Sequence, residues 1–243
     1  MTPNQPTKIL VPAGALGIPY DRTALANGVK RQPDLIAIDG GSTDSGPYYL
    51  GTGTSKYSRS ATKADWAVLM AARATAGVPL LIGTAGTCGS DSAVDWMLDI
   101  TLEIARERGE HLNIATMKSG QDSSRVKAAL DTGRIIALDA APAIDGSTVE
   151  DCANIVALAG IEQIQAALNT GADIIIAGRA TDTAVIAALP ITRGCHRGAA
   201  WHGAKVAECG ALATTNPNSG DSQFFICFDG CGHLTGQYTV WGQ

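Results

Sequence analysis

The sequence at positions 35–46 is Leu35-Ile36-Ala37-Ile38-Asp39-Gly40-Gly41-Ser42-Thr43-Asp44-Ser45-Gly46. A short apolar run ends at Asp39 and gives way to glycines, hydroxyl side chains and a second carboxylate at Asp44. An apolar run of this length is typical of a parallel strand that is buried on both faces. In open α/β sheets, functional groups lie just beyond the carboxyl ends of the strands. The stretch therefore predicts a parallel strand followed by a functional loop.

Three later loops have the same composition, and each follows an apolar run. They are Gly83–Ser92, Ser119–Ser124 and Ala177–Thr183. Because parallel strands end at one edge of a sheet, we expect the four loops to lie together there. The alternative is that their Gly, Ser, Thr and Asp residues are ordinary turn and helix-cap residues.

Apolar runs and helix-like segments alternate along the chain. Strands are expected at Lys8–Val11, Leu35–Asp39, Leu80–Gly83, Asn113–Met117, Ile135–Leu138, Ile155–Leu158 and Ala172–Ala177. Helices are expected at Asp21–Lys30, Ser60–Ala76, Asp91–Arg108, Ser123–Thr132, Ile161–Thr170 and Thr181–Leu189, the last stopped by Pro190. This alternation predicts an α/β fold with a mostly parallel sheet flanked by helices, layered and doubly wound. A barrel is the alternative, since about seven strand–helix units approach the eight that a barrel needs.

Composition and charge exclude several classes of protein. The formal net charge of -5 and the lack of a basic cluster argue against nucleic-acid binding. No apolar stretch approaches the ~20 residues of a membrane span, and Met1–Thr7 lacks a signal peptide's apolar core, so we expect a cytoplasmic protein. The six cysteines lack zinc-ligand spacing, so we expect free thiols and no metal. Gly14 and Gly17 miss the dinucleotide-binding fingerprint, and no cofactor is identified.

The candidate catalytic residues are Asp39, Asp44 and His202. A carboxylate at a strand end can act as a general base, and histidine titrates near neutral pH. His202 follows Trp201, so packing is its alternative role. Arg179 is a candidate clamp for a carboxylate or phosphate, against a structural ion pair with a neighbouring Asp. The candidate substrate-binding residues are Gly41, Ser42, Thr43, Ser45, Thr84, Thr87, Gln121, Arg179, Thr181 and Asp182; for Asp182, as for Asp91, capping a helix is an equally strong interpretation.

Several long strings carry a family resemblance. They are Ile38–Gly51, Gly83–Thr87, Gly171–Asp173, Ala177–Ala184, Trp201–Lys205 and Glu208–Leu212. Over residues 8–212 the chain resembles the acyclic terpene utilisation family. That family is associated with bacterial breakdown of terpenes such as citronellol and geraniol, whose intermediates are acyl-CoA esters. The resemblance implies a small-molecule substrate, and it brings no settled reaction and no catalytic residue.

The remaining segment departs from that family. Thr215–Phe228 and His233–Gly242 resemble part of a bacterial cyclophilin, a peptidyl-prolyl isomerase. The resemblance implies that Gln223 and Phe225 match active-site positions, and that His233, Leu234 and Tyr238 match the proline pocket. The arginine-bearing segment of cyclophilins is missing, so we expect no isomerase activity. The expected division is an α/β domain at 1–212 and a partial, incomplete β segment at 213–243.

Three hypotheses for the function follow. The chain is a truncated family member that binds or acts on a small carboxylate or an acyl-CoA ester in terpenoid or fatty-acyl catabolism. Alternatively it is a folding helper that uses the cyclophilin-like segment, or a non-catalytic scaffold or binding module. A homo-oligomer and a missing C-terminal domain both remain open.

Overall fold

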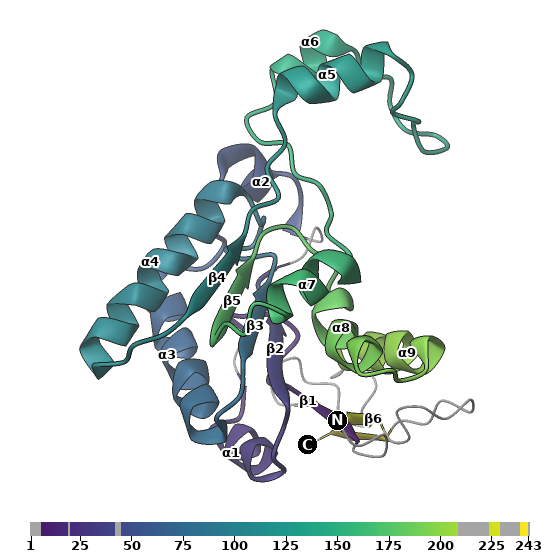
Figure 1. Cartoon of the computed structure of the whole chain (residues 1–243). Coiled ribbons are helices and arrows are strands. Elements are labelled where there is room, and N and C mark those ends of the chain that lie inside the picture. The colour runs from purple at the N-terminus through teal and green to yellow at the C-terminus, as the bar shows by residue number, and fades with distance from the viewer. Residues whose placement is uncertain (1–5, 19, 42–44, 209–223, 229–238, 243) are drawn as a thin grey trace.

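A computed structural model describes residues 6–18, 20–41, 45–208, 224–228 and 239–242 (Figure 1). Within these residues, seven strands form one open sheet whose first five strands are parallel and whose last two are antiparallel. The order across the sheet is β4 (Ile114–Met117), β5 (Ile174–Ala177), β3 (Leu80–Gly83), β2 (Leu35–Asp39), β1 (Thr7–Val11), β6 (Phe224–Phe228) and β7 (Thr239–Gly242). The predicted α/β fold with a mostly parallel sheet is confirmed. The barrel alternative is wrong, because the sheet ends at two edges, β4 and β7.

Helices cover both faces of the sheet because successive strand residues point to opposite sides. Ile36 and Ile38 of β2 belong to a core shared with α1 (Arg22–Lys30), α3 (Arg59–Ala76) and α4 (Asp91–Arg108). Leu35 and Ala37 belong to a second core shared with α7 (Ile161–Leu168), α8 (Ala184–Thr192) and α9 (Arg197–Glu208). The two groups of helices lie on opposite sides of the strands in Figure 1, which is the predicted doubly wound arrangement.

The strand order reverses between β3 and β5. From β1 to β4 the connecting helices lie on the α3 and α4 face, and the return from β4 to β5 passes through α7 on the other face. Right-handed crossovers require this change of face when the direction of winding changes. The neighbouring strands β3 and β5 are therefore followed by helices on opposite faces. Such a switch point is where open α/β sheets bind ligands.

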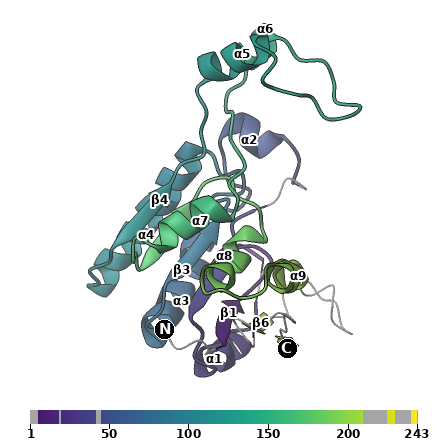
Figure 2. The ribbon, with the colours of Figure 1, turned by 45° about the vertical axis from the view of Figure 1, so that its right-hand side comes forward.

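An arm projects beyond the carboxyl edge of the sheet, and both views show it (Figures 1 and 2). It contains α5 (Ser123–Asp131) and α6 (Gly146–Glu150), and α2 (Tyr48–Thr52) lies beside its base. The strands expected at Ile135–Leu138 and Ile155–Leu158 are wrong. In the arm no strand lies beside Ile136, which is 88% exposed, and Val156 forms only an isolated bridge to Gly120. An apolar run forms a strand only where a partner strand is within reach.

Three further expectations need correction. Pro190 does not stop α8, which continues to Thr192 and is closed by the bond from Arg193 N–H to Leu189 O (3.0 Å). Short α2 and the longer α9 were not expected. Cys88 and Cys152 are free thiols as predicted, whereas Cys195 is disulfide-bonded.

In the described part of the chain, no helix has both the length and the apolar character needed to cross a bilayer.

Candidate functional site

The four predicted loops meet at the carboxyl edge, where backbone hydrogen bonds fasten them to one another. Gly40 N–H, after β2, donates to Gly83 O at 2.6 Å. Thr84 N–H, after β3, donates to Gly178 O at 3.0 Å. The loops after β4 and β5 are joined in turn by the Ser119 hydroxyl, which donates to Arg179 O at 3.1 Å. The sequence therefore predicts correctly which loops come together.

Asp39 is a buried carboxyl group at this edge, with 6% of its surface exposed. It continues the Leu35 and Ala37 row of β2, so its side chain lies on the α8 face of the sheet. Gly41 N–H donates to Asp39 Oδ2 at 3.1 Å. The other carboxyl oxygen, Oδ1, is buried and has no hydrogen-bond partner among the described residues. A buried polar atom without a partner is costly and calls for an explanation.

Gly83 lies between Asp39 and helix α8, where a side chain would clash with Val185. A β-carbon at Gly83 would stand 3.5 Å from Asp39 Oδ1 and 3.8 Å from the Ala180 methyl group. It would also stand 2.7 Å from Val185 Cγ1 of α8. Asp39 therefore lies beside the loop that follows β5, at the switch point of the sheet.

Burial and charge set the protonation of Asp39. Burial raises the pKa of Asp39 well above its ordinary value, and the nearby charge of Asp182 raises it further. The hydrogen bonds from the backbone and the charge of Arg179 oppose that rise. The raised pKa means that the fold favours the neutral form over the charged form, and in the neutral form the carboxyl group has a proton to donate.

Asp182 is the second carboxyl group of the cluster, and it is only half-buried. Burial raises the pKa of Asp182, and the charge of Glu208 adds to the rise, whereas Arg179 and Lys205 lower it. Asp182 does not cap α8, since the Thr181 hydroxyl takes that hydrogen bond from Ala184 N–H at 3.2 Å. Its carboxyl group is thus not used to hold the helix.

Arg179 brings a cation to the same loop. Its backbone N–H donates to Gly89 O at 3.0 Å, and its carbonyl oxygen accepts from Ala159 N–H at 2.9 Å. The side chain is half-buried, and no ion pair or hydrogen bond of its guanidinium occurs within the described residues. Its charge nevertheless acts on Asp39 and Asp182, whose pKa values it lowers, so the role of Arg179 in ligand binding stays a prediction beside the structural alternative.

Several predicted substrate-binding residues instead hold the loops together. For these residues the alternative interpretation, that they are ordinary turn and helix-cap residues, fits the structure. Gly41 has no room for a side chain, because a β-carbon would stand 2.3 Å from Thr87 Cα. The hydroxyl bonds are Thr84 to Ala180 O (3.1 Å), Lys56 N–H to Thr87 (3.0 Å), and Ala184 N–H to Thr181. Ser45 is half-buried, with no hydrogen bond among the described residues, and Ser42, Thr43 and Asp44 lie outside the described residues.

His202 is exposed on α9, and the interactions described at Asp39 and Asp182 do not include it. Glu208, at the end of the same helix, is a residue that the sequence analysis missed. It is 4% exposed and pairs with Lys205. Glu208 follows Ala200 and Ala204 at a spacing of four, which places the three residues on one face of a helix. This apolar face, ending in a carboxylate, is the sequence pattern from which a buried Glu208 could have been predicted.

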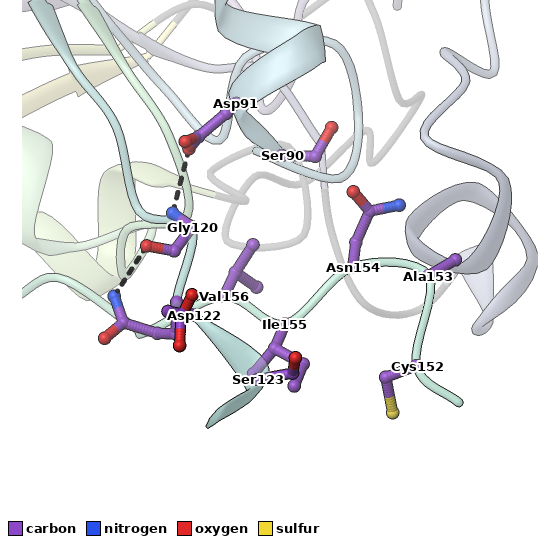
Figure 3. A pocket seen from close by; sticks show the side chains of 11 residues that line it. Ser90, Asp91, Gly120, Asp122, Ser123, Cys152, Ala153, Asn154, Ile155 and Val156 are labelled. Atoms are coloured by element: carbon purple, nitrogen blue, oxygen red, sulfur yellow. Dashed lines mark hydrogen bonds between the residues drawn. The ribbon is translucent and has the colours of Figure 1, made fainter. Parts of the chain in front are cut away.

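A polar pocket of about 370 Å³ lies at the base of the arm (Figure 3), and neither Asp39 nor Arg179 is among its lining residues. Asp91, at the start of α4, points to the Gly120 backbone and accepts its N–H at 2.8 Å. Ser90, rather than Asp91 or Ser92, caps α4 through a bond from Ala93 N–H. The lining residues are Ser90, Asp91, Gly120, Gln121, Asp122, Ser123, Cys152, Ala153, Asn154, Ile155 and Val156; two are carboxylates and none is basic.

No group of three or more His, Cys, Asp or Glu side chains in the described ranges could hold a metal ion. The predicted proline-pocket residues Gln223, Leu234 and Tyr238, with His233, lie outside the described residues. Phe225 lies in β6, which pairs antiparallel with β1 through Leu10. Strand β6 of the cyclophilin-like segment thus extends the sheet beyond β1.

Two family models match the chain. The model described as "Acyclic terpene utilisation family protein AtuA" matches residues 67–215, more than half of the chain. The model of cyclophilin type peptidyl-prolyl cis-trans isomerases matches residues 202–243. Arg179, Asp182 and Glu208 fall inside the first match, and Asp39 precedes it. No curated protein and no solved structure matches the chain.

Proposed function

This chain belongs to the acyclic terpene utilisation family, and on that premise we propose that it binds and acts on a small carboxylate or an acyl-CoA ester. The proposed site is the cluster of Asp39, Arg179 and Asp182, named here the switch-point cluster. The observation that carries the proposal is Asp39, a buried carboxyl group with an unpartnered oxygen beside the loop that bears a guanidinium and a second carboxyl group.

Arg179 supports the choice of an anionic ligand. A guanidinium binds carboxylate and phosphate groups through two parallel hydrogen bonds. The guanidinium of Arg179 makes no such bond within the described structure, although the backbone N–H and C=O of Arg179 are both hydrogen-bonded. Because the backbone of Arg179 is already held in place before a ligand binds, less conformational entropy is lost on binding.

Asp39 supports the presence of a carbonyl group in the ligand. Burial favours the neutral form of Asp39, and buried carboxylic acids in their neutral form donate hydrogen bonds that polarise carbonyl groups in enzymes. Asp39 is buried, whereas Asp182 and Arg179 are each half-buried and so are partly accessible to a ligand. A carboxylate offers both the oxygen and the negative charge that these groups can bind, and an acyl-CoA ester offers the oxygen at its thioester carbonyl and the negative charge at its phosphates.

The pocket at the base of the arm is the less suitable place for such a ligand. Asp91 and Asp122 would repel a carboxylate or a phosphate, and no lining residue is basic. The charge of its lining therefore favours the switch-point cluster.

Isothermal titration tests the proposal, with butyryl-CoA, butyrate and free coenzyme A as ligands. We expect binding of butyryl-CoA, and a loss of about tenfold or more in affinity for Arg179→Ala, since a charge-assisted bond contributes about 1.5–3 kcal/mol. The matched control is Arg134→Ala, an exposed arginine whose Nε donates to Thr132 on the arm. Absence of heat with every ligand at millimolar concentration, or equal losses in both variants, would overturn the proposal.

A further inference from the structure

Strand β4 forms one edge of the sheet, and within the described residues no strand pairs with its outer side. Asn113 O and Met117 O accept backbone hydrogen bonds from the chain at β5 and just after it. Because backbone groups alternate in direction along a strand, those of Ile114 and Thr116 point to the open side. The edge therefore offers hydrogen-bond donors and acceptors to an added strand.

An open groove of about 430 Å³ lies where α4 leads into β4. Its apolar lining includes Ile114 and the partly exposed Leu102. Glu110, in the same lining, accepts from Arg108 Nε at 2.6 Å through Oε1, whereas its Oε2 is buried without a hydrogen-bond partner among the described residues. Arg106 also lines the groove, but it is exposed and water screens its charge. The groove thus combines an apolar surface with a carboxyl oxygen that lacks a donor.

The arm carries an apolar segment, Arg134–Asp139, in the loop between α5 and α6. Ile136 and Leu138 in this segment are 88% and 84% exposed. The arm projects beyond the carboxyl edge of the sheet, so the segment is accessible to a second molecule (Figures 1 and 2). Adjacent apolar side chains as exposed as these mark a contact surface.

We propose that the segment Arg134–Asp139 of one copy pairs, as an added parallel strand, with the open edge of β4 in a second copy. Ile136 then lies beside Ile114, which packs in the core shared with α4. Leu138, two residues further on, lies beside Thr116 and faces the same side, above the groove. Main-chain hydrogen bonds supply affinity in such strand additions, and side chains supply specificity. Since every copy carries both surfaces, two copies can exchange segments in a closed dimer.

Charges at the two ends of β4 favour the parallel direction. In this direction Arg134 comes to the end where Glu110 Oε2 lacks a donor. Asp139 comes to the other end, beside the exposed Lys118, whose Nζ contacts Asp95 Oδ2 at 2.8 Å. An antiparallel segment would exchange its two ends and bring like charges together at each. The complementary charges therefore identify a second copy of this chain as the occupant.

Sedimentation velocity of the whole chain at a series of concentrations tests the proposal. We expect reversible association, and Ile136→Glu should weaken it by about tenfold or more, because a charge replaces a side chain that is buried only in the contact. Ile144→Glu is the matched control, since Ile144 is exposed on the same arm but lies outside the segment. It should associate as the wild type does. A chain that stays monomeric at every concentration overturns the proposal.

Two further results of that experiment would also overturn it. Equal weakening in Ile136→Glu and Ile144→Glu would show that the segment has no particular role. Association that Ile136→Glu does not weaken would assign the contact to another surface, such as two β4 edges. Circular dichroism of each variant checks that the fold is retained, as the exposure of both side chains leads us to expect.

A charge exchange tests the parallel direction. Lys118→Glu and Asp139→Lys should each weaken association by about twofold to fivefold, because each brings like charges together. The double variant should recover the wild-type association, and failure to recover would overturn the parallel pairing. This surface lies outside the switch-point cluster, so Ile136→Glu should bind butyryl-CoA as the wild type does. The proposed function and this inference therefore succeed or fail in separate measurements.

Discussion

Gly89 and Arg179 are in direct backbone contact. Arg179 N–H donates to Gly89 O at 3.0 Å, and a β-carbon on Gly89 would stand 2.4 Å from Arg179 N. Gly89 also has a φ of +66°, a conformation that other residues adopt only with strain. The loop after β3 therefore fixes the backbone of the residue that is proposed to bind the ligand.

Replacing Gly89 by alanine should both destabilise the fold and displace Arg179. We expect a loss of about 2 kcal/mol or more in the free energy of unfolding, because strain and a backbone clash combine. Gly109→Ala is the matched control, since Gly109 has a φ of +65° and open space around it. Its cost should be the strain alone, about 1 kcal/mol. Urea denaturation measures both variants, and equal losses would show that the contact with Arg179 is unimportant.

The buried Asp39 should make the fold less stable as pH rises. Its pKa is higher in the folded chain than in the unfolded chain, so the folded state binds more protons above pH ~4. Stability then falls with rising pH until the pKa of the folded state is passed, by at most about 1.4 kcal/mol per pH unit for one group. Asp39→Asn, which cannot ionise, should remove this contribution.

Urea denaturation at pH 5 and pH 8 checks the sign of this effect. The advantage of Asp39→Asn over the wild type should grow between the two values, because only the wild type must ionise or hold a buried proton. Asp139→Asn, at an exposed position, should show no such growth. A difference between Asp39→Asn and wild type that shrinks toward pH 8 would contradict the assignment of a raised pKa.

The sequence predicts the sheet well where apolar runs are buried on both faces. β2 and β3 are recognised because short apolar runs end at Asp39 and Gly83, where the chain turns. Ile135–Leu138 has the same apolar character, yet it lies on the projecting arm without a neighbouring strand. Apolar composition reports the tendency to be extended and buried, and it does not report whether a partner strand is within reach.

The candidate site is predictable to a similar extent. Asp39, Arg179 and Asp182 follow from their places after strands, and the structure brings their loops together. Glu208 is missed because its helix, α9, was not expected, and His202 is selected on residue type alone. The hydroxyl groups of Thr84 and Thr181 hold loops together, a role that composition does not separate from ligand binding.

A hydrogen bond between α3 and α4 should stabilise the fold without affecting the ligand site. Trp66 Nε1 donates to Thr101 Oγ1 at 2.9 Å, and both side chains are fully buried on the face opposite to Asp39. Thr101→Val should cost about 1–3 kcal/mol, because the indole N–H loses its acceptor. Thr75→Val is the control, an exposed threonine that bonds only the carbonyl of Ala71. A loss of butyryl-CoA affinity in Thr101→Val would contradict the placement of the site.

The cyclophilin-like segment should not catalyse prolyl isomerisation. All five residues of β6 pair with β1, from Thr7 opposite Phe228 to Val11 opposite Phe224, so this strand belongs to the α/β sheet. The arginine-bearing segment that the resemblance requires is missing from the sequence. A proline-peptide assay should therefore give the uncatalysed rate, with an active cyclophilin as the positive control. Acceleration that is proportional to the concentration of the chain would refute this expectation.

The charges on α9 should shift the pKa of Asp182 in opposite directions. Glu208 is buried and raises the pKa of Asp182, whereas Lys205 lowers it. Glu208→Gln should therefore lower the pKa of Asp182, and Lys205→Met should raise it. The pair is its own control, because both substitutions alter one charge on the same helix. A general effect of either change on the fold would not produce shifts of opposite sign.

Carboxyl ¹³C NMR as a function of pH measures these shifts, with Asp182→Asn identifying the resonance. Denaturation of each variant accompanies the titration, since Lys205→Met leaves the buried Glu208 carboxylate without its partner and should destabilise the fold. If both variants shift the pKa of Asp182 in the same direction, the charges on α9 do not control that pKa electrostatically. If neither shifts it, Asp182 lies too far from α9 for Glu208 to belong to the site.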